Sequence, residues 1–165
     1  MSHRCRGDYF AVLKNKLEAR PFIADEYFSA KIGEMVTFKD SEWIVVTAKN
    51  AGATLSSRNA FVKPLSTSGK YVVVNFTVTN RTKKEDRILN HPVLVDAKER
   101  EFRNLDNQAF YIPEGGSTMG LEALPPDMKR EFWAVYEVPA DATELKFQAR
   151  ALSSFGGKRL VSLGF

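Results

Sequence analysis

Few residues of this chain have the chemistry that catalysis or metal binding requires. The 165 residues include only two histidines, His3 and His91, and one cysteine, Cys5. A nucleophile needs a positioned base beside it, and a zinc site needs several nitrogen, sulfur or oxygen ligands in tight geometry. His91 directly precedes a proline, and the histidines and the cysteine show no ligand spacing. We therefore expect no catalytic residue, no metal site, no cofactor and no disulfide within the chain.

Two other patterns suggest chemistry but have simpler interpretations. Glu99 and Glu101 lie on one side of an expected strand, as paired acid and base carboxylates would. Arginines surround them, so a solvated charged face is the favoured interpretation. The glycine-rich stretch 115–120 resembles a phosphate loop, but such loops lead into a helix, and Pro125-Pro126 arrives too soon. We interpret this stretch as an ordinary loop.

Aromatic side chains offer a more promising surface. In the expected strand 129–138, Trp133 and Val135 share the face opposite the predicted core side. Phe110 and Tyr111 cluster just before a Pro-Glu-Gly-Gly turn. We take Phe110, Tyr111, Trp133 and Val135 as the candidate interaction surface. The alternative is a second packed surface, covered by the N-terminal segment.

Trp43 and Tyr71, together with Trp133, are a further candidate for an aromatic face on which bases or sugars stack.

The elements that must position these residues centre on the stretch Gly69–Asn80. Its even positions from 72 to 78 are all apolar, whereas its odd positions change from apolar to polar along the stretch. This period of two predicts a long strand, bounded by a glycine at its start and by Asn-Arg-Thr at its end. The even positions, Val72, Val74, Phe76 and Val78, are expected to face the core.

Further strands follow from the same periodicity. Alternation over 32–39 and 43–48 predicts a hairpin, and so do 88–96 and 100–103, where Leu94 and Phe102 point inward. Strands are also expected at 129–138, 145–149 and 159–165. The stretch 105–120 is expected to be a loop, and 49–69 a long loop with at most one short edge strand, because Pro64 cannot donate within a sheet interior. About seven to nine short strands without a convincing βαβ unit indicate an all-β antiparallel sandwich, immunoglobulin-like in class.

The chain divides into a short leader and one domain. We place the leader at 1–29 and the sandwich at 30–165. Apolar residues at spacings of three and four predict a short amphipathic helix over 8–20, which Pro21 ends. Such a helix docks on the domain, binds a partner or continues an upstream segment, and the sequence leaves these alternatives open.

Composition narrows the range of partners. The 24 basic and 20 acidic residues are interleaved, so the net charge of +4 gives no basic arm for nucleic acid. No stretch has the ~20 apolar residues of a membrane span. We also expect no signal peptide and no lipidated cysteine in these residues. Association of two copies of the chain is left open.

The order of the strands resembles a known family. Lys31–Glu34 precedes the first hairpin, Gly69–Val74 begins the central strand, Leu94–Asp96 comes next, and Glu131–Pro139 follows. Over residues 30–152 this order resembles the telokin-like bacterial immunoglobulin-fold domain, a family of unknown function related to immunoprotective extracellular antigens and lipoproteins. The resemblance implies export or lipid anchoring, although the N-terminal residues contain no such signal. It supplies no catalytic residues.

The expected function is therefore binding rather than catalysis. We predict a non-enzymatic β-sandwich that binds another protein or serves as an accessory module of the bacterial cell envelope. The alternative is a small-ligand-binding sandwich that uses the loop 104–120. A hydrolase that depends on His91 is the third hypothesis.

Overall fold

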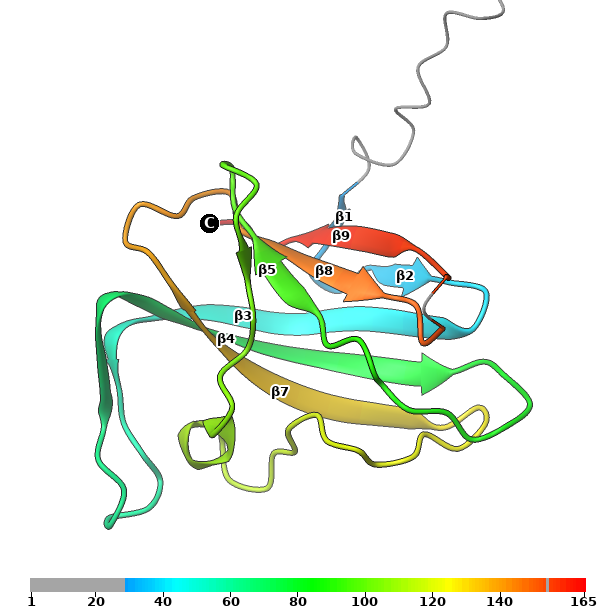
Figure 1. Cartoon of the computed structure of the whole chain (residues 1–165), viewed down its shortest axis with the longest axis horizontal. Coiled ribbons are helices and arrows are strands. Elements are labelled where there is room, and N and C mark those ends of the chain that lie inside the picture. The colour runs from blue at the N-terminus through cyan, green and yellow to red at the C-terminus, as the bar shows by residue number, and fades with distance from the viewer. Residues whose placement is uncertain (1–28, 154) are drawn as a thin grey trace, which may run out of the picture.

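The computed structural model describes residues 29–153 and 155–165, which form two β-sheets packed face to face (Figure 1). One sheet has the strand order β2–β3–β4–β7, and the other has the order β1–β9–β8–β5–β6. The elements are β1 (Ala30–Lys31), β2 (Met35–Thr37), β3 (Ser41–Leu55), β4 (Leu65–Asn80), β5 (Val93–Val95), β6 (Glu101–Phe102), the 3-10 helix η1 (Gln108–Tyr111), β7 (Lys129–Val138), β8 (Lys146–Arg150) and β9 (Lys158–Ser162).

The architecture confirms the predicted all-β sandwich. The described part of the chain contains nine strands, and neighbouring strands are antiparallel except for β1 and β9, which are parallel. The expected helix over 8–20 lies outside the described residues. Within those residues, no helix is long and apolar enough to cross a membrane.

The predicted central strand is β4, which pairs with β3 on one side and β7 on the other. Its core-facing side chains are fully buried, at 0% exposure for Val72, Val74, Phe76 and Val78. A Cβ at Gly69 would lie 2.1 Å from the carbonyl oxygen of Val138. Glycine at this position therefore allows β7 to approach β4 closely.

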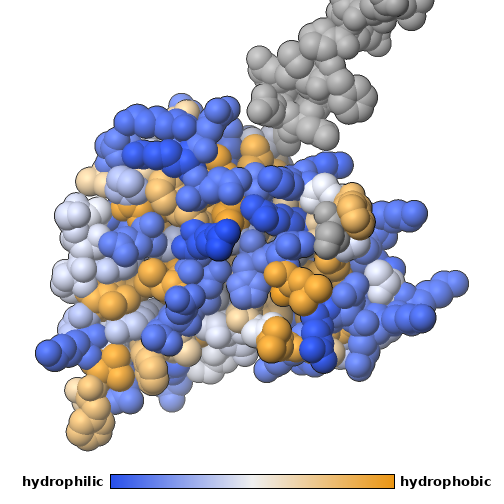
Figure 2. All heavy atoms as spheres, in the orientation of Figure 1, coloured by the Kyte–Doolittle hydropathy of each residue, from blue (hydrophilic) through white to orange (hydrophobic). Residues whose placement is uncertain are grey.

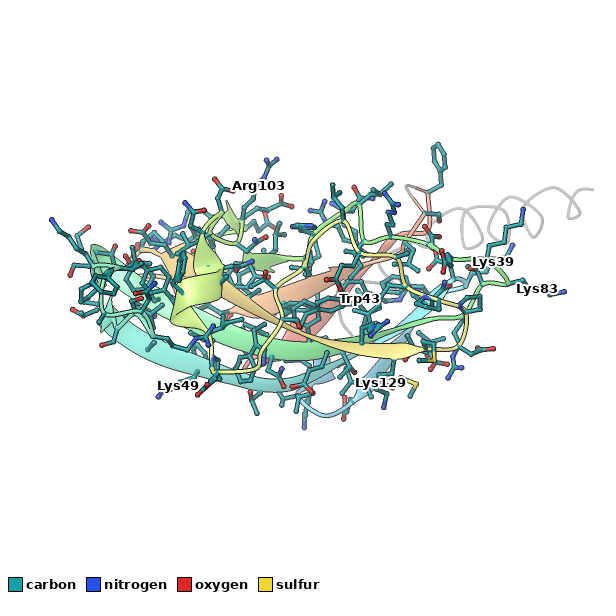
Figure 3. The ribbon with its side chains drawn as sticks, turned by 90° about the horizontal axis from the view of Figure 1, so that it is seen from below. Lys39, Trp43, Lys49, Lys83, Arg103 and Lys129 are labelled. Atoms are coloured by element: carbon teal, nitrogen blue, oxygen red, sulfur yellow. The ribbon has the colours of Figure 1, made fainter. Side chains whose placement is uncertain are left out.

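Aromatic rings fill the space between the sheets. The ring of Phe76 lies 5.7 Å from that of Trp43, 5.9 Å from Phe132 and 5.0 Å from Phe147, measured between centroids. Figure 3 shows Trp43 between the two layers, and its exposure is only 1%. Trp43 is therefore a core residue, and the idea that it presents an exposed stacking face is wrong.

The stretch 49–69 is not the long loop that its composition suggested. β3 continues to Leu55 and β4 begins at Leu65, so residues 49–69 form a hairpin, which we call the arm. Leu55 pairs with Leu65 at the end of the paired part of the arm (Figure 1). The pairing tolerates small polar residues because the arm projects from the core and irregularities interrupt its register. At one of these, Gly52 has a φ of +77° and donates its N–H to Asn50 Oδ1 at 3.0 Å.

The predicted hairpin across Ala97–Glu99 is formed by β5 and β6, with Leu94 paired to Phe102. Asp96 is buried, and its carboxylate accepts hydrogen bonds from the backbone N–H groups of Lys98 and Arg100 and from Arg100 Nε. Burial raises the pKa of Asp96, but the hydrogen bonds from Arg100 outweigh this effect and hold the pKa below its ordinary value.

A second carboxylate, Asp141, joins the same turn from outside the hairpin. Its oxygens lie 2.6 Å from Lys98 Nζ and 3.1 Å from Arg100 Nη2. These hydrogen bonds lower the pKa of Asp141 to about 2. Ion pairs and hydrogen bonds among charged side chains thus hold the turn together. Glu99 lies in the same turn and is exposed, with a φ of +62°.

Candidate functional site

The loop 104–120 covers the edge of β7. The N–H of Trp133 donates to Ser117 O, the N–H of Leu105 donates to Val135 O, and the N–H of Val135 donates to Gln108 Oε1, each at 2.8 Å. These bonds satisfy backbone groups that an open edge would leave unpaired. The loop is consequently fixed against the sandwich.

This arrangement corrects one of the candidate residues. Val135 has 0% exposure, because Ile112 from the loop packs with it and with Tyr71 and Val73 in a second apolar cluster. The prediction that Val135 lies on an open face is wrong. The covering element is the loop itself, whose apolar residues the sequence revealed without showing where they pack.

Trp133 is partly exposed and packs against the second apolar cluster. Beside it, Gly116 approaches so closely that a Cβ there would lie 2.9 Å from Trp133 Cδ1. Glycine at position 116 therefore allows the loop to pass over the indole ring. The described residues place no α-helix after this loop, which supports its interpretation as an ordinary loop.

Between the loop and the β3–β4 arm lies a hollow of about 480 Å³, which we call the apolar cleft. Val73 and Ile112 are buried at its base, Tyr111 and Trp133 are partly exposed, and Lys49 and Arg58 are exposed cations at its border. The lining residues are Thr47, Lys49, Ala51, Leu55, Arg58, Val73, Tyr111, Ile112, Pro113 and Trp133.

Hydrogen bonds between η1 and the arm fix the shape of the apolar cleft. Arg58 donates its N–H to Phe110 O and its Nη2 to Ala109 O, both at 2.9 Å. The hydroxyl of Tyr111 donates to Lys63 O at 3.0 Å. The site is therefore preformed, even though its two walls are far apart in the sequence.

Exposed aromatic residues lie near this cleft. Phe110, in η1, is 43% exposed, and Phe61, at the end of the arm, is 97% exposed. Figure 2 shows hydrophobic side chains at the tip of the arm, which lies at the lower left of the view. Of the four candidate residues, Tyr111 and Trp133 line the apolar cleft, Phe110 is exposed and precedes Tyr111 in η1, and Val135 is buried.

A second hollow, of about 550 Å³, is lined by other residues of the loop 104–120, and we call it the polar cleft. It is lined by Leu89, Asn90, His91, Pro92, Val93, Glu101, Arg103, Asn104, Asp106, Gln108, Thr118, Met119 and Arg150. Sequence reasoning missed this cluster, because its residues come from four separate segments.

The polar cleft is lined by titratable and hydrogen-bonding side chains, including the hydroxyl of Thr118. His91, Glu101 and Asp106 line it, but none of the described lining residues is a serine or a cysteine. In the described part of the chain, no group of three or more histidine, cysteine, aspartate or glutamate side chains could hold a metal ion. The arrangement offers hydrogen-bonding groups and charges, which are suited to binding.

Comparisons with known proteins identify the fold class. No family model matches the chain, and no curated protein sequence matches it significantly. Among solved structures, it is similar to the yjhA protein from Bacillus subtilis, with 16% identity over 81% of this chain and 98% of that one and a TM-score of 0.62. It is also similar to an uncharacterized β-sandwich protein from Clostridium difficile 630, with 10% identity over 84% and 97% and a TM-score of 0.51.

A third similar structure is the secreted protein MPT63 from Mycobacterium tuberculosis. It has 13% identity over 82% of this chain and 96% of that one, with a TM-score of 0.54. At these identities the likeness concerns the fold alone. The chain is thus a β-sandwich similar in fold to bacterial β-sandwich proteins.

Proposed function

We propose that this chain is a non-enzymatic module that binds another protein through the apolar cleft. The observation that carries the proposal is a preformed apolar hollow with partly exposed Tyr111 and Trp133, next to the exposed Phe110. Tyrosine, tryptophan and arginine are enriched among the residues that dominate protein interfaces. An anchor side chain from a partner would displace water from this hollow.

The charges at the border indicate the chemistry of the partner. Lys49 and Arg58 line the apolar cleft, and none of its lining residues is acidic. Figure 3 shows Lys49 pointing outward from the four-stranded sheet. A complementary segment would carry an apolar or aromatic anchor with an acidic side chain beside it.

The absence of catalysis is part of the proposal. The apolar cleft is lined by no histidine, cysteine, serine or carboxylate, and its only hydroxyl and amine groups are those of Thr47, Tyr111 and Lys49. In the polar cleft, His91 has no serine or cysteine among the lining residues to activate. These observations support a binding role.

The proposed setting is the bacterial cell envelope. The strand motifs resemble the telokin-like immunoglobulin-fold family, whose members are usually exported or lipid-anchored. One protein of similar fold, MPT63, is described as secreted. Both observations support an accessory module of the envelope, and membership of the telokin-like family is part of this proposal.

Charge reversal at the cleft border tests the binding proposal. The tagged full chain and its Lys49→Glu variant would be used to capture proteins from envelope extracts of the source bacterium, with quantitative mass spectrometry. Lys129→Glu is the matched control, because Lys129 is an exposed lysine on the same sheet outside the apolar cleft.

We expect a partner that the wild type and Lys129→Glu enrich equally and that Lys49→Glu loses. Equal capture by all three proteins would contradict binding at this cleft. If the chain captures only itself and sediments as a dimer, the partner at this cleft is a second copy of the chain and not a different protein.

A further inference from the structure

The polar cleft has features that the proposed protein-binding site does not use. Its volume of about 550 Å³ falls within the range of about 300–1,000 Å³ typical of small-molecule sites. Buried Val93 and Met119 provide apolar surface, whereas most other lining residues are polar or charged. The cleft therefore suits a compact ligand with many polar groups.

The charges of the cleft are balanced but incompletely paired. Arg103 and Arg150 face a lining that also includes Glu101 and Asp106, so the formal charges cancel. Arg150 Nη2 lies 3.1 Å from Gln148 Oε1 but 3.9 Å from Glu101 Oε2, which is too far for a hydrogen bond.

The Nε atom of Arg150 is buried and has no hydrogen-bond partner among the described residues. No other side-chain nitrogen or oxygen in the described part of the chain is buried in this way. The guanidinium of Arg150 lines the cleft, and its one ion pair among the described residues is the 3.9 Å contact with Glu101. Since a guanidinium prefers close, planar, two-oxygen acceptors, a ligand carboxylate at the Nη groups would be a better partner.

Neutral polar groups complete the lining. Gln108 Oε1 accepts the N–H of Val135, which fixes the side chain and leaves its amide NH₂ as a donor at the cleft. Asn90, His91 and Asn104 add both donors and acceptors. Hydroxyl groups both donate and accept hydrogen bonds, so a hydroxylated ligand matches this mixture.

We propose that the polar cleft binds a small hydroxylated carboxylate of the sugar-acid class. Its carboxylate pairs with Arg150, and its hydroxyls bond to the amides and to Glu101 and Asp106. The two acidic residues disfavour a polyanion such as a nucleotide. The inference does not depend on the apolar cleft, because no residue lines both clefts.

Chemical-shift titration of the isotope-labelled full chain tests the inference. The probes are D-glucuronate, D-glucose, which lacks the carboxylate, and inorganic phosphate, which lacks the hydroxylated carbon frame. For a ligand of this size, a dissociation constant of about 1 mM or below is expected. Glucuronate should shift amides in 89–93 and 101–108, whereas glucose and phosphate should bind at least about tenfold more weakly.

Variants locate the carboxylate contact. Arg150→Gln should weaken glucuronate binding by about tenfold or more, whereas Arg130→Gln, an exposed arginine of β7 outside the cleft, should leave it unchanged. The chemical-shift changes of the wild type show where glucuronate binds, independently of either variant.

Several results would overturn the inference. They are no saturable shift with glucuronate at millimolar concentration, shifts confined to other regions, equal binding of glucose or phosphate, or unchanged binding by a folded Arg150→Gln variant. None of them bears on the protein capture that tests the apolar cleft.

Discussion

Replacing Phe76 with alanine should remove a large part of the stability of this domain. Phe76 is 0% exposed, and its ring has three aromatic neighbours with centroid distances of 5.0–5.9 Å. A buried Phe→Ala change costs about 3–5 kcal/mol. Each lost aromatic pair contributes about 0.5–1.5 kcal/mol beyond area burial, which places Phe76→Ala toward the upper end of that range.

Urea unfolding, followed by circular dichroism, measures the effect. Whole-domain stabilities are about 5–15 kcal/mol, and a domain of this size has a urea dependence of about 2 kcal/mol per M. The midpoint should therefore fall by about 2 M. Thr77→Ala is the matched control, because Thr77 is the next residue of β4, is only partly buried and should cost about 0.5 kcal/mol. Equal midpoints for the two variants would refute the assignment of the core face of β4.

Three other predictions follow from particular contacts. Gly69→Ala should lower the melting temperature strongly, because its Cβ would lie 2.1 Å from the Val138 carbonyl oxygen. Gly120→Ala is the control and should have little effect, because a Cβ there would have no atom within 4 Å. Similar losses of melting temperature in the two variants would contradict the packing of β4 on β7. The pKa of Asp141 is about 2 in the folded protein and about 3.9 in the unfolded chain. The ionised carboxylate therefore stabilises the folded state slightly above pH ~4, and this stabilisation is lost as the pH falls through ~2. Asp141→Asn should therefore make the melting temperature fall less steeply over this range, and an unchanged slope would show that the carboxylate is not paired. A panel of hydrolase substrates should show no turnover by the wild type, and turnover that His91→Ala abolishes would overturn the non-enzymatic assignment.

The strands with strict alternation were predictable from the sequence. Even positions 72–78 of β4 and 132–138 of β7 are apolar and buried, as the period of two predicted, whereas the burial of Tyr71, Val73 and Val135 on the other face was not predicted. The arm was missed because the residues of 49–55 are small or polar and make no apolar stripe. Backbone pairing between β3 and β4 holds its strands together, and this pairing cannot be predicted from the amino-acid composition of the stretch.

The candidate site was only partly predictable. The cluster Phe110-Tyr111-Ile112 was visible as an apolar group within a loop, but its docking over Val135 depends on long-range packing. The polar cleft was beyond local patterns altogether, because Arg150 meets segments far away in the sequence. The local sequence around Arg150, at the end of β8, does not indicate that its side chain lines a cleft.

The most direct test of the central claim is site-specific photo-crosslinking of the full chain in living cells of the source bacterium. A photoreactive phenylalanine analogue would replace Tyr111 at the apolar cleft or, as the control, Phe155, which is 100% exposed and outside the cleft. We predict a discrete covalent adduct with another protein from position 111, weakened by Lys49→Glu, and no such adduct from position 155. Adducts that are absent from position 111, or equally abundant from both positions, would contradict protein binding at this cleft.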